Sequence, residues 1–169
     1  VLEARWSEIT TATDLWTLPA ERSKTGRAHR VPLTERGCAI LAEARAQSTM
    51  SDFVFPSPVT QRPLSNNTLL HLLQKRLDVD ATVHGFRGAF KTWAAECTHF
   101  GNEVSEMALS HTIANRVEAA YQHSDLLEKR RGLMAAWDHF VCQETEGGAN
   151  VVAIPHVVSY SSDGIPHVS

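Results

Sequence analysis

Hydrophobic and polar positions in the first part of the chain predict a hairpin followed by a helix. Two short apolar runs, at 15–18 and 30–33, are separated by a polar stretch, which is typical of two antiparallel strands joined by a flexible tip. Thr34 stands before residues 35–46, where apolar side chains recur at helical spacing, so we expect it to cap that helix. The triplet at 53–55, before a proline, predicts one more short strand.

The chain from there to residue 146 shows mainly the helical period. Apolar side chains recur at helical spacing in segments at 69–77, 84–97, 102–109, 117–121 and 126–140. The expected caps are Asn66 or Asn67, Asn102, and Ser124 or Asp125. The apolar face at 84–97 is expected to include Phe86, Phe90, Trp93 and Ala94. This pattern predicts a mostly helical α+β fold with a small antiparallel sheet.

The composition changes abruptly after Glu146. Gly147 and Gly148 open a tail rich in Val, Ser, Pro, Gly and His, in which only 151–154 is strand-like. We therefore expect one domain at 1–146 and a partly strand-like or disordered tail at 147–169, and a chain of 169 residues suits one compact domain. The chain opens at Val1 within what reads as structured sequence, so we expect it to be a piece of a longer protein.

Composition narrows the class of protein. Hydrophobic residues make up 43% and charged residues 21%, which is enough apolar material for a core. The formal net charge of -3 excludes a generally polycationic protein of the histone kind. Three widely spaced cysteines argue against a disulfide framework and fit a reducing compartment. No apolar run approaches the roughly 20 residues of a membrane span.

Charge is unevenly distributed along the chain. Residues 21–36 hold five basic and two acidic side chains, whereas 96–128 hold six acidic side chains and one arginine. The hairpin should therefore attract phosphate, and the acidic stretch should repel it. A solvated charged hairpin without a ligand is the alternative interpretation.

Four residues stand out for their chemistry. His84 and Arg87 lie three apart at the start of a predicted helix, on one face, where the arginine can bind an anion and the histidine can donate a hydrogen bond or move a proton. His111 and Tyr121 follow. Taken singly, the first two form an ordinary surface pair, and a lone tyrosine is usually a half-buried packing residue.

Read in order with Lys24 on the hairpin tip, these residues resemble the catalytic domain of the tyrosine recombinases, also called the phage integrase family. The stretches at 16–19, 23–26, 82–87, 118–121 and 125–131 are similar to integrases of satellite-type prophages and genomic islands. Together the similar stretches extend from residue 1 to about 143. The resemblance implies the fold of a DNA breaking-rejoining enzyme.

The resemblance also implies a role for each residue. Tyr121 would be the nucleophile that forms a 3′-phosphotyrosyl bond, and Arg87 would hold a non-bridging phosphate oxygen. His84 would bind the phosphate or take the tyrosine proton, His111 would be a second hydrogen-bond donor, and Lys24 would protonate the leaving 5′-oxygen. The side chains expected to bind DNA are Arg22, Arg27, Arg30 and Lys91.

The partners implied are double-stranded DNA attachment sites, a homotetramer on DNA in the full-length protein, and an excision factor, all in the bacterial cytoplasm. The chain alone is expected to be a monomer that binds DNA weakly and in a salt-sensitive way. No cofactor or metal is expected. His99, His111 and His123 lack the close spacing of a helical zinc pair.

Two departures from the family pattern matter. The family's first catalytic arginine is expected just before Val1, so Arg5 is interpreted as a surface or structural residue, and the chain alone should be nearly inactive. His111 and Tyr121 are ten apart, one more than the commonest spacing in the family. Two alternatives stay open: a DNA-binding relic of an integrase, and a type IB topoisomerase, which relaxes DNA without exchanging partners.

Overall fold

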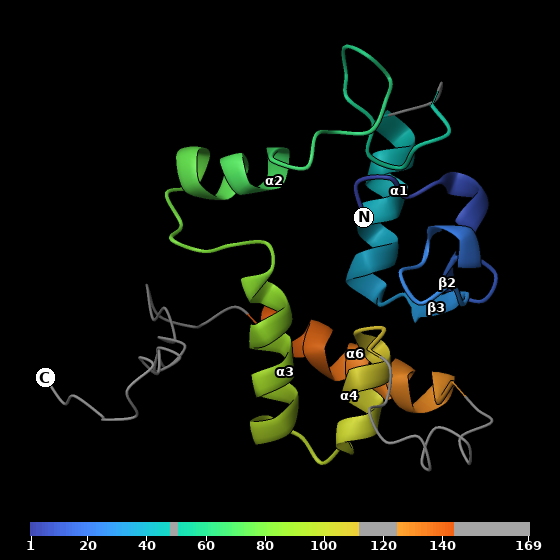
Figure 1. Ribbon diagram of the computed structural model, residues 1–169, viewed down its shortest axis with the longest axis vertical. Helices are drawn as coiled ribbons and strands as arrows, with labels where there is room; N and C mark the ends of the chain where they lie inside the picture. The colour runs from blue at the N-terminus through green and yellow to red at the C-terminus, as the bar shows by residue number, and fades with distance from the viewer. Residues whose placement is uncertain (48–50, 112–124, 144–169) are drawn as a thin grey trace, which may run out of the picture.

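A three-stranded antiparallel sheet forms from the first part of the chain. The computed structural model describes residues 1–47, 51–111 and 125–143, and Figure 1 shows their arrangement. Strands β1 (Ile9–Thr10), β2 (Leu15–Leu18) and β3 (His29–Pro32) lie in that order, with Trp16 opposite Val31. The predicted hairpin is confirmed as β2 and β3, and it gains β1 as a two-residue edge.

Helix α1 (Glu35–Gln47) begins where the sequence predicted. The Gly37 backbone N–H donates to the Thr34 hydroxyl oxygen at 3.1 Å, so the predicted cap is confirmed. The strand expected at 53–55 is wrong, because Arg5 and Phe53 form only an isolated bridge. The partner segment turns into a short 3-10 helix at Trp6–Glu8, so pairing cannot extend further.

The remaining helices are α2 (Thr68–His71), a π-helical turn at Leu72–Arg76, α3 (Gly85–Cys97), α4 (Asn102–Ala108) and α6 (Leu127–Cys142). The leucine-rich helix expected at 69–77 is present at 68–76, where α2 continues without interruption into the π-helical turn. The 117–121 segment, Ser124 and the 147–169 tail lie outside the described residues.

Three expected caps are corrected. Asn67 occupies the predicted N-cap position of α2, but its side chain makes no cap hydrogen bond. Gly101 rather than Asn102 is the N-cap of α4, and the Asn102 side chain accepts a hydrogen bond from Lys91 instead. Leu126 occupies the N-cap position of α6, because the Asp125 carboxylate is bound by arginine side chains.

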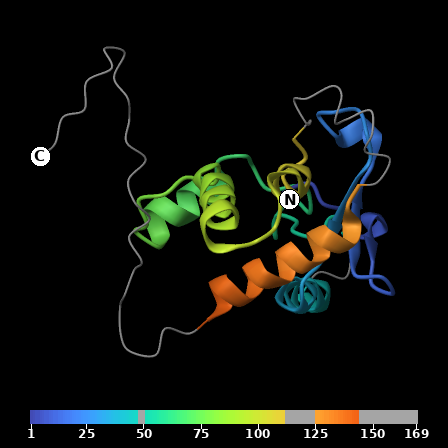
Figure 2. The ribbon, with the colours of Figure 1, turned by 90° about the horizontal axis from the view of Figure 1, so that it is seen from below.

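The core lies where α3, α4 and α6 meet. Figure 2 shows α6 as a long helix with α1 on one side and α3 and α4 on the other. Phe90 of α3 packs edge-to-face on Trp137 of α6, with ring centroids 5.4 Å apart, and Leu133 is fully buried. Phe86 was expected on this apolar face but is 51% exposed, since the buried residues of α3 begin at Phe90.

The mostly helical α+β prediction is confirmed. All three cysteines are free thiols. None of the described helices is long and apolar enough to cross a membrane.

Candidate active site

Arg87 and His111, which the sequence singled out separately, lie side by side on the exposed surface. The Arg87 guanidinium Nη2 donates to the carbonyl oxygen of Leu109 at 2.7 Å and lies 2.8 Å from Nε2 of His111. A guanidinium carries five N–H donors, and this arrangement occupies those of one nitrogen. The other donors of Arg87 can therefore hold an anion beside the imidazole.

The end of α4 explains why His111 reaches Arg87. Ser110 adopts a left-handed conformation with φ of 57°, and its N–H donates to the Met107 carbonyl at 3.1 Å. The His111 N–H donates to the Glu106 carbonyl at 2.9 Å, which completes the Schellman arrangement that ends many helices. This reversal brings the imidazole back over the last turn of the helix.

Glu106 connects the pair to a lysine. Its Oε2 lies 2.6 Å from His111 Nδ1, and its Oε1 lies 2.6 Å from Lys91 Nζ. The hydrogen bond from Lys91 and the one from His111 lower the pKa of Glu106, against the opposing effect of burial. Lys91 also donates to Asn102 and Ser105, so it lies within a network that joins α3 to α4.

Sequence reasoning missed Glu106 because it counted this residue in an acidic, phosphate-repelling stretch. A usable signal was present. Glu106 precedes His111 by five positions, which is a little more than one helical turn, and a histidine just past a helix end can fold back onto that turn.

The other predicted residues are not brought together in the same way. His84 is the N-cap of α3 and is exposed, and Lys24 and Arg27 are exposed in the connection between β2 and β3. Within the described ranges, no side-chain hydrogen bond or ion pair joins them to Arg87. Tyr121, the expected nucleophile, lies outside the described residues.

Arg22 has a structural partner. It forms an ion pair with Glu8, which is 8% exposed, and its Nη2 donates to the Glu3 carbonyl at 2.6 Å. Burial raises the pKa of Glu8, but hydrogen bonds from the Trp16 indole, the Arg5 backbone and Arg22 outweigh it and leave the pKa lowered. This contact draws the side chain of Arg22 toward the base of the sheet.

Arg30 is likewise engaged. Its Nε and Nη2 donate to the two carboxylate oxygens of Asp125, each at 2.8 Å. Arg130 of α6 is 1% exposed and donates to the Asp125 carboxylate, to the Asp125 carbonyl and to the Arg30 carbonyl. Next to Arg30 on β3, His29 has its pKa lowered, first by burial and then by the charge of Arg130.

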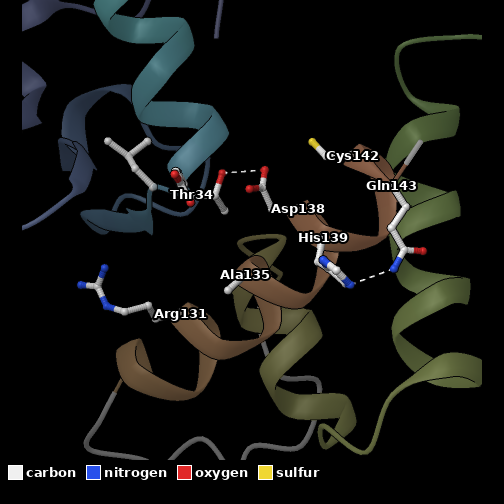
Figure 3. Close-up of a pocket in the computed structure, with 9 residues that line it drawn as sticks. Thr34, Arg131, Ala135, Asp138, His139, Cys142 and Gln143 are labelled. Atoms are coloured by element: carbon white, nitrogen blue, oxygen red, sulfur yellow. Dashed lines mark hydrogen bonds between the residues drawn. The ribbon is translucent and has the colours of Figure 1, made fainter.

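A pocket of about 520 Å³ lies elsewhere, between the start of α1 and the second half of α6 (Figure 3). There the Thr34 hydroxyl donates to Asp138 at 2.9 Å, and His139 lies 2.7 Å from the Gln143 amide. None of the predicted site residues lines it. The pocket therefore marks the junction of two helices rather than the candidate chemistry.

The fold and the Arg87–His111 pair define a helical α+β domain with an exposed candidate site for an anion. The phage integrase family profile matches residues 1–128, and the chain belongs to this family of tyrosine recombinases. Its relatives include prophage integrases, so the resemblance found in the sequence is confirmed.

Three relatives illustrate the match. Prophage integrase IntA of Escherichia coli (strain K12) is 36% identical over 141 residues, 82% of this chain and 34% of the relative. Prophage integrase IntZ of the same strain is 30% identical over 86% of this chain and 36% of the relative. The integrase of Enterobacteria phage P4 is 26% identical over 93% of this chain and 40% of the relative. The chain thus spans 34% to 40% of these proteins. No solved structure matches it.

Proposed function

We propose that this chain is the catalytic part of a site-specific DNA recombinase that integrates and excises prophage DNA. One observation carries the proposal: Arg87 and His111, distant in sequence, lie 2.8 Å apart on the surface of a phage integrase domain. A guanidinium beside an imidazole supplies the positive charge and the hydrogen bonds that a phosphodiester undergoing attack requires. The proposed site of action is the bacterial cytoplasm.

In the proposed reaction, the Tyr121 oxygen attacks the scissile phosphorus, and the bond from phosphorus to the 5′-oxygen breaks. A phenol has a reference pKa of about 10, so its proton must be removed, and His84 is the proposed acceptor. Lys24 gives a proton to the leaving 5′-oxygen. Attack by the 5′-hydroxyl of a second strand on the phosphotyrosine reverses the step and joins new partners.

Arg87 and His111 act on the phosphate itself. Arg87 binds a non-bridging oxygen, and its charge offsets the negative charge that grows as the phosphorus becomes five-coordinate. His111 donates to the same group. Each such donor contributes on the order of 100- to 1,000-fold to the rate. Because these charges come from side chains, the proposal requires no cofactor.

The exposed hairpin is the proposed contact to the DNA backbone. Lys24 and Arg27 are exposed on it, whereas Arg22, Arg30 and Lys91 are held by acidic partners and would have to exchange these for phosphate. The proposed partners are duplex attachment sites, a homotetramer on DNA and an excision factor. The family's first arginine is proposed to precede Val1, so the chain alone should have little activity.

The test is covalent trapping on DNA. The chain, joined to the upstream sequence of its gene, is incubated with a nicked attachment-site duplex that prevents religation, beside the Tyr121→Phe variant. A protein-DNA band that survives denaturant and is absent with the variant supports the proposal. Relaxation of supercoiled DNA without strand exchange would favour a topoisomerase instead. Specific DNA binding with no covalent band would favour a non-catalytic relic.

A further inference from the structure

We propose that Glu106 is a positioning residue for His111: it holds the Nδ1 hydrogen of the ring and thereby directs Nε2 at the anion site beside Arg87. The statement about the ring stands on the geometry of α3 and α4. Its consequence for DNA cleavage rests on the proposed function.

The contacts of the two ring nitrogens fix which one carries hydrogen. Nε2 of His111 faces Nη2 of Arg87 at 2.8 Å, and a guanidinium has donors only. Nε2 must therefore be the nitrogen that accepts. The hydrogen of a neutral ring then lies on Nδ1, which is 2.6 Å from the Glu106 carboxylate. Both contacts are satisfied by the same tautomer, and the opposite tautomer would oppose two N–H groups at Nε2.

Glu106 is itself held in place. Its second oxygen lies 2.6 Å from Lys91 Nζ, and Lys91 is fixed by Asn102 and by Ser105, which is 4% exposed. The lowered pKa of Glu106 keeps it ionised and able to accept from both sides. Each carboxylate oxygen therefore has a separate task, one toward the helix junction and one toward the imidazole.

This arrangement matters when a phosphate binds. A phosphate that also draws Nη2 of Arg87 away from His111 leaves Nε2 of the ring facing an anion instead of a guanidinium. A ring that is charged in that state donates from Nε2 to the phosphate while its Nδ1–H remains on Glu106. A buried or oriented carboxylate that holds the far nitrogen of a histidine sets ring orientation in the same way in other sites.

Ring-nitrogen NMR shifts of His111 test the proposal without any DNA. In the unmodified protein, at a pH where the ring is neutral, the Nδ1–H form should predominate. In Glu106→Gln, the remaining oxygen cannot serve both Lys91 and His111, and the Nε2–H form should rise. Glu103→Gln, the same charge change on the same helix, should leave the tautomer unchanged.

Two outcomes would overturn the proposal. One is a predominant Nε2–H form in the unmodified protein, a result that requires no variant to fold. The other is an unchanged tautomer in Glu106→Gln whose backbone amide spectrum is otherwise retained. Lys91→Met removes the lysine that joins α3 to α4 but keeps the Glu106 contact to His111. The Nδ1–H form should therefore persist in this variant, which separates the orientation of the ring from the joining of the helices.

Trapping on nicked DNA then measures how Glu106 affects the rate of DNA cleavage. Glu106→Gln should slow covalent complex formation at saturating DNA by about tenfold or more with little change in DNA affinity, whereas Glu103→Gln should not. A tautomer shift together with an unaltered cleavage rate would refute the catalytic part of the proposal. Absence of a covalent complex with the unmodified protein would refute the proposed function and leave the ring assignment standing.

Discussion

Two arginine clusters in this domain use the same chemical groups for different ends. Arg130 is 1% exposed, and all three nitrogens of its guanidinium donate to Asp125 or to the Arg30 carbonyl. Arg87 is exposed, and among the described residues only its Nη2 has partners, the Leu109 carbonyl and His111. The first cluster ties β3 to α6, and the second presents unused donors at the surface.

The difference lies in burial and in the number of donors already taken. A buried guanidinium whose nitrogens are all bonded contributes to the fold and has no capacity left for a ligand. An exposed one with spare donors adds little to stability and can bind an anion. Position in the sequence does not make this distinction, because both arginines lie on predicted helices.

Removing the buried guanidinium should have the largest effect. Arg130→Met leaves the Asp125 carboxylate without its buried partner and orphans two carbonyl groups, so the free energy of unfolding should fall by about 3 to 5 kcal/mol. Urea titration followed by circular dichroism measures this. A decrease in the free energy of unfolding of less than about 1 kcal/mol is typical of a surface arginine. That result would contradict the structural role assigned to Arg130 and its contrast with Arg87.

Removing the exposed guanidinium should act on chemistry instead. Arg87→Met should change the free energy of unfolding by no more than about 1 kcal/mol. In the same variant, covalent trapping on nicked DNA should slow by roughly 100- to 1,000-fold, since a donor to the phosphate is lost. If this variant unfolds as readily as Arg130→Met, the division between the two clusters is wrong.

Arg30 lies between the two cases, because its bidentate pair with Asp125 is exposed. Arg30→Gln should cost about 1 kcal/mol or less in unfolding free energy. If Arg30 also exchanges Asp125 for a phosphate, the variant should lower the slope of log affinity against log salt by about one. An unchanged slope would assign Arg30 to the fold alone.

The smallest expected effect is on the pH dependence of stability. The pKa of Glu106 is lowered below its ordinary value of 4.5, so its contribution is present above that value and is lost as pH falls through the lower folded value. The free energy of unfolding of the unmodified protein should therefore fall on acidification below about pH 4.5. This fall should exceed that of Glu106→Gln by about 1 kcal/mol or less. A stability difference that stays constant over that interval would show that Glu106 is not paired.

The sequence predicted the hairpin, the Thr34 cap and the helices that carry Phe90, Trp93 and Trp137, because each depends on local periodicity or on one capping side chain. It missed the fate of Asp125, expected as a cap and held instead by Arg30 and Arg130. Arg30 and Asp125 are 95 positions apart, and Arg22 and Glu8 are 14 apart, so neither pairing has a local signature in the sequence; the same holds for Lys91 and Glu106, which lie on different helices. For this reason the expected phosphate contacts of Arg22, Arg30 and Lys91 could not be distinguished from structural ion pairs.

Within the candidate site, the sequence named Arg87 and His111 but could not show that they meet. That contact depends on the left-handed conformation of Ser110. A glycine at this position would have predicted such a conformation, but a serine does not. The assignment of Tyr121, Lys24 and His84 depends on family resemblance and remains a prediction.

The most direct test of the central claim is to identify the amino acid that becomes linked to DNA. The trapped complex is digested with nuclease and trypsin, and the peptides are analysed by mass spectrometry. The account predicts a nucleotide adduct in the tryptic peptide 117–129, on Tyr121. An adduct on any other residue would contradict the assignment of the nucleophile and, with it, the proposed geometry of attack beside Arg87 and His111.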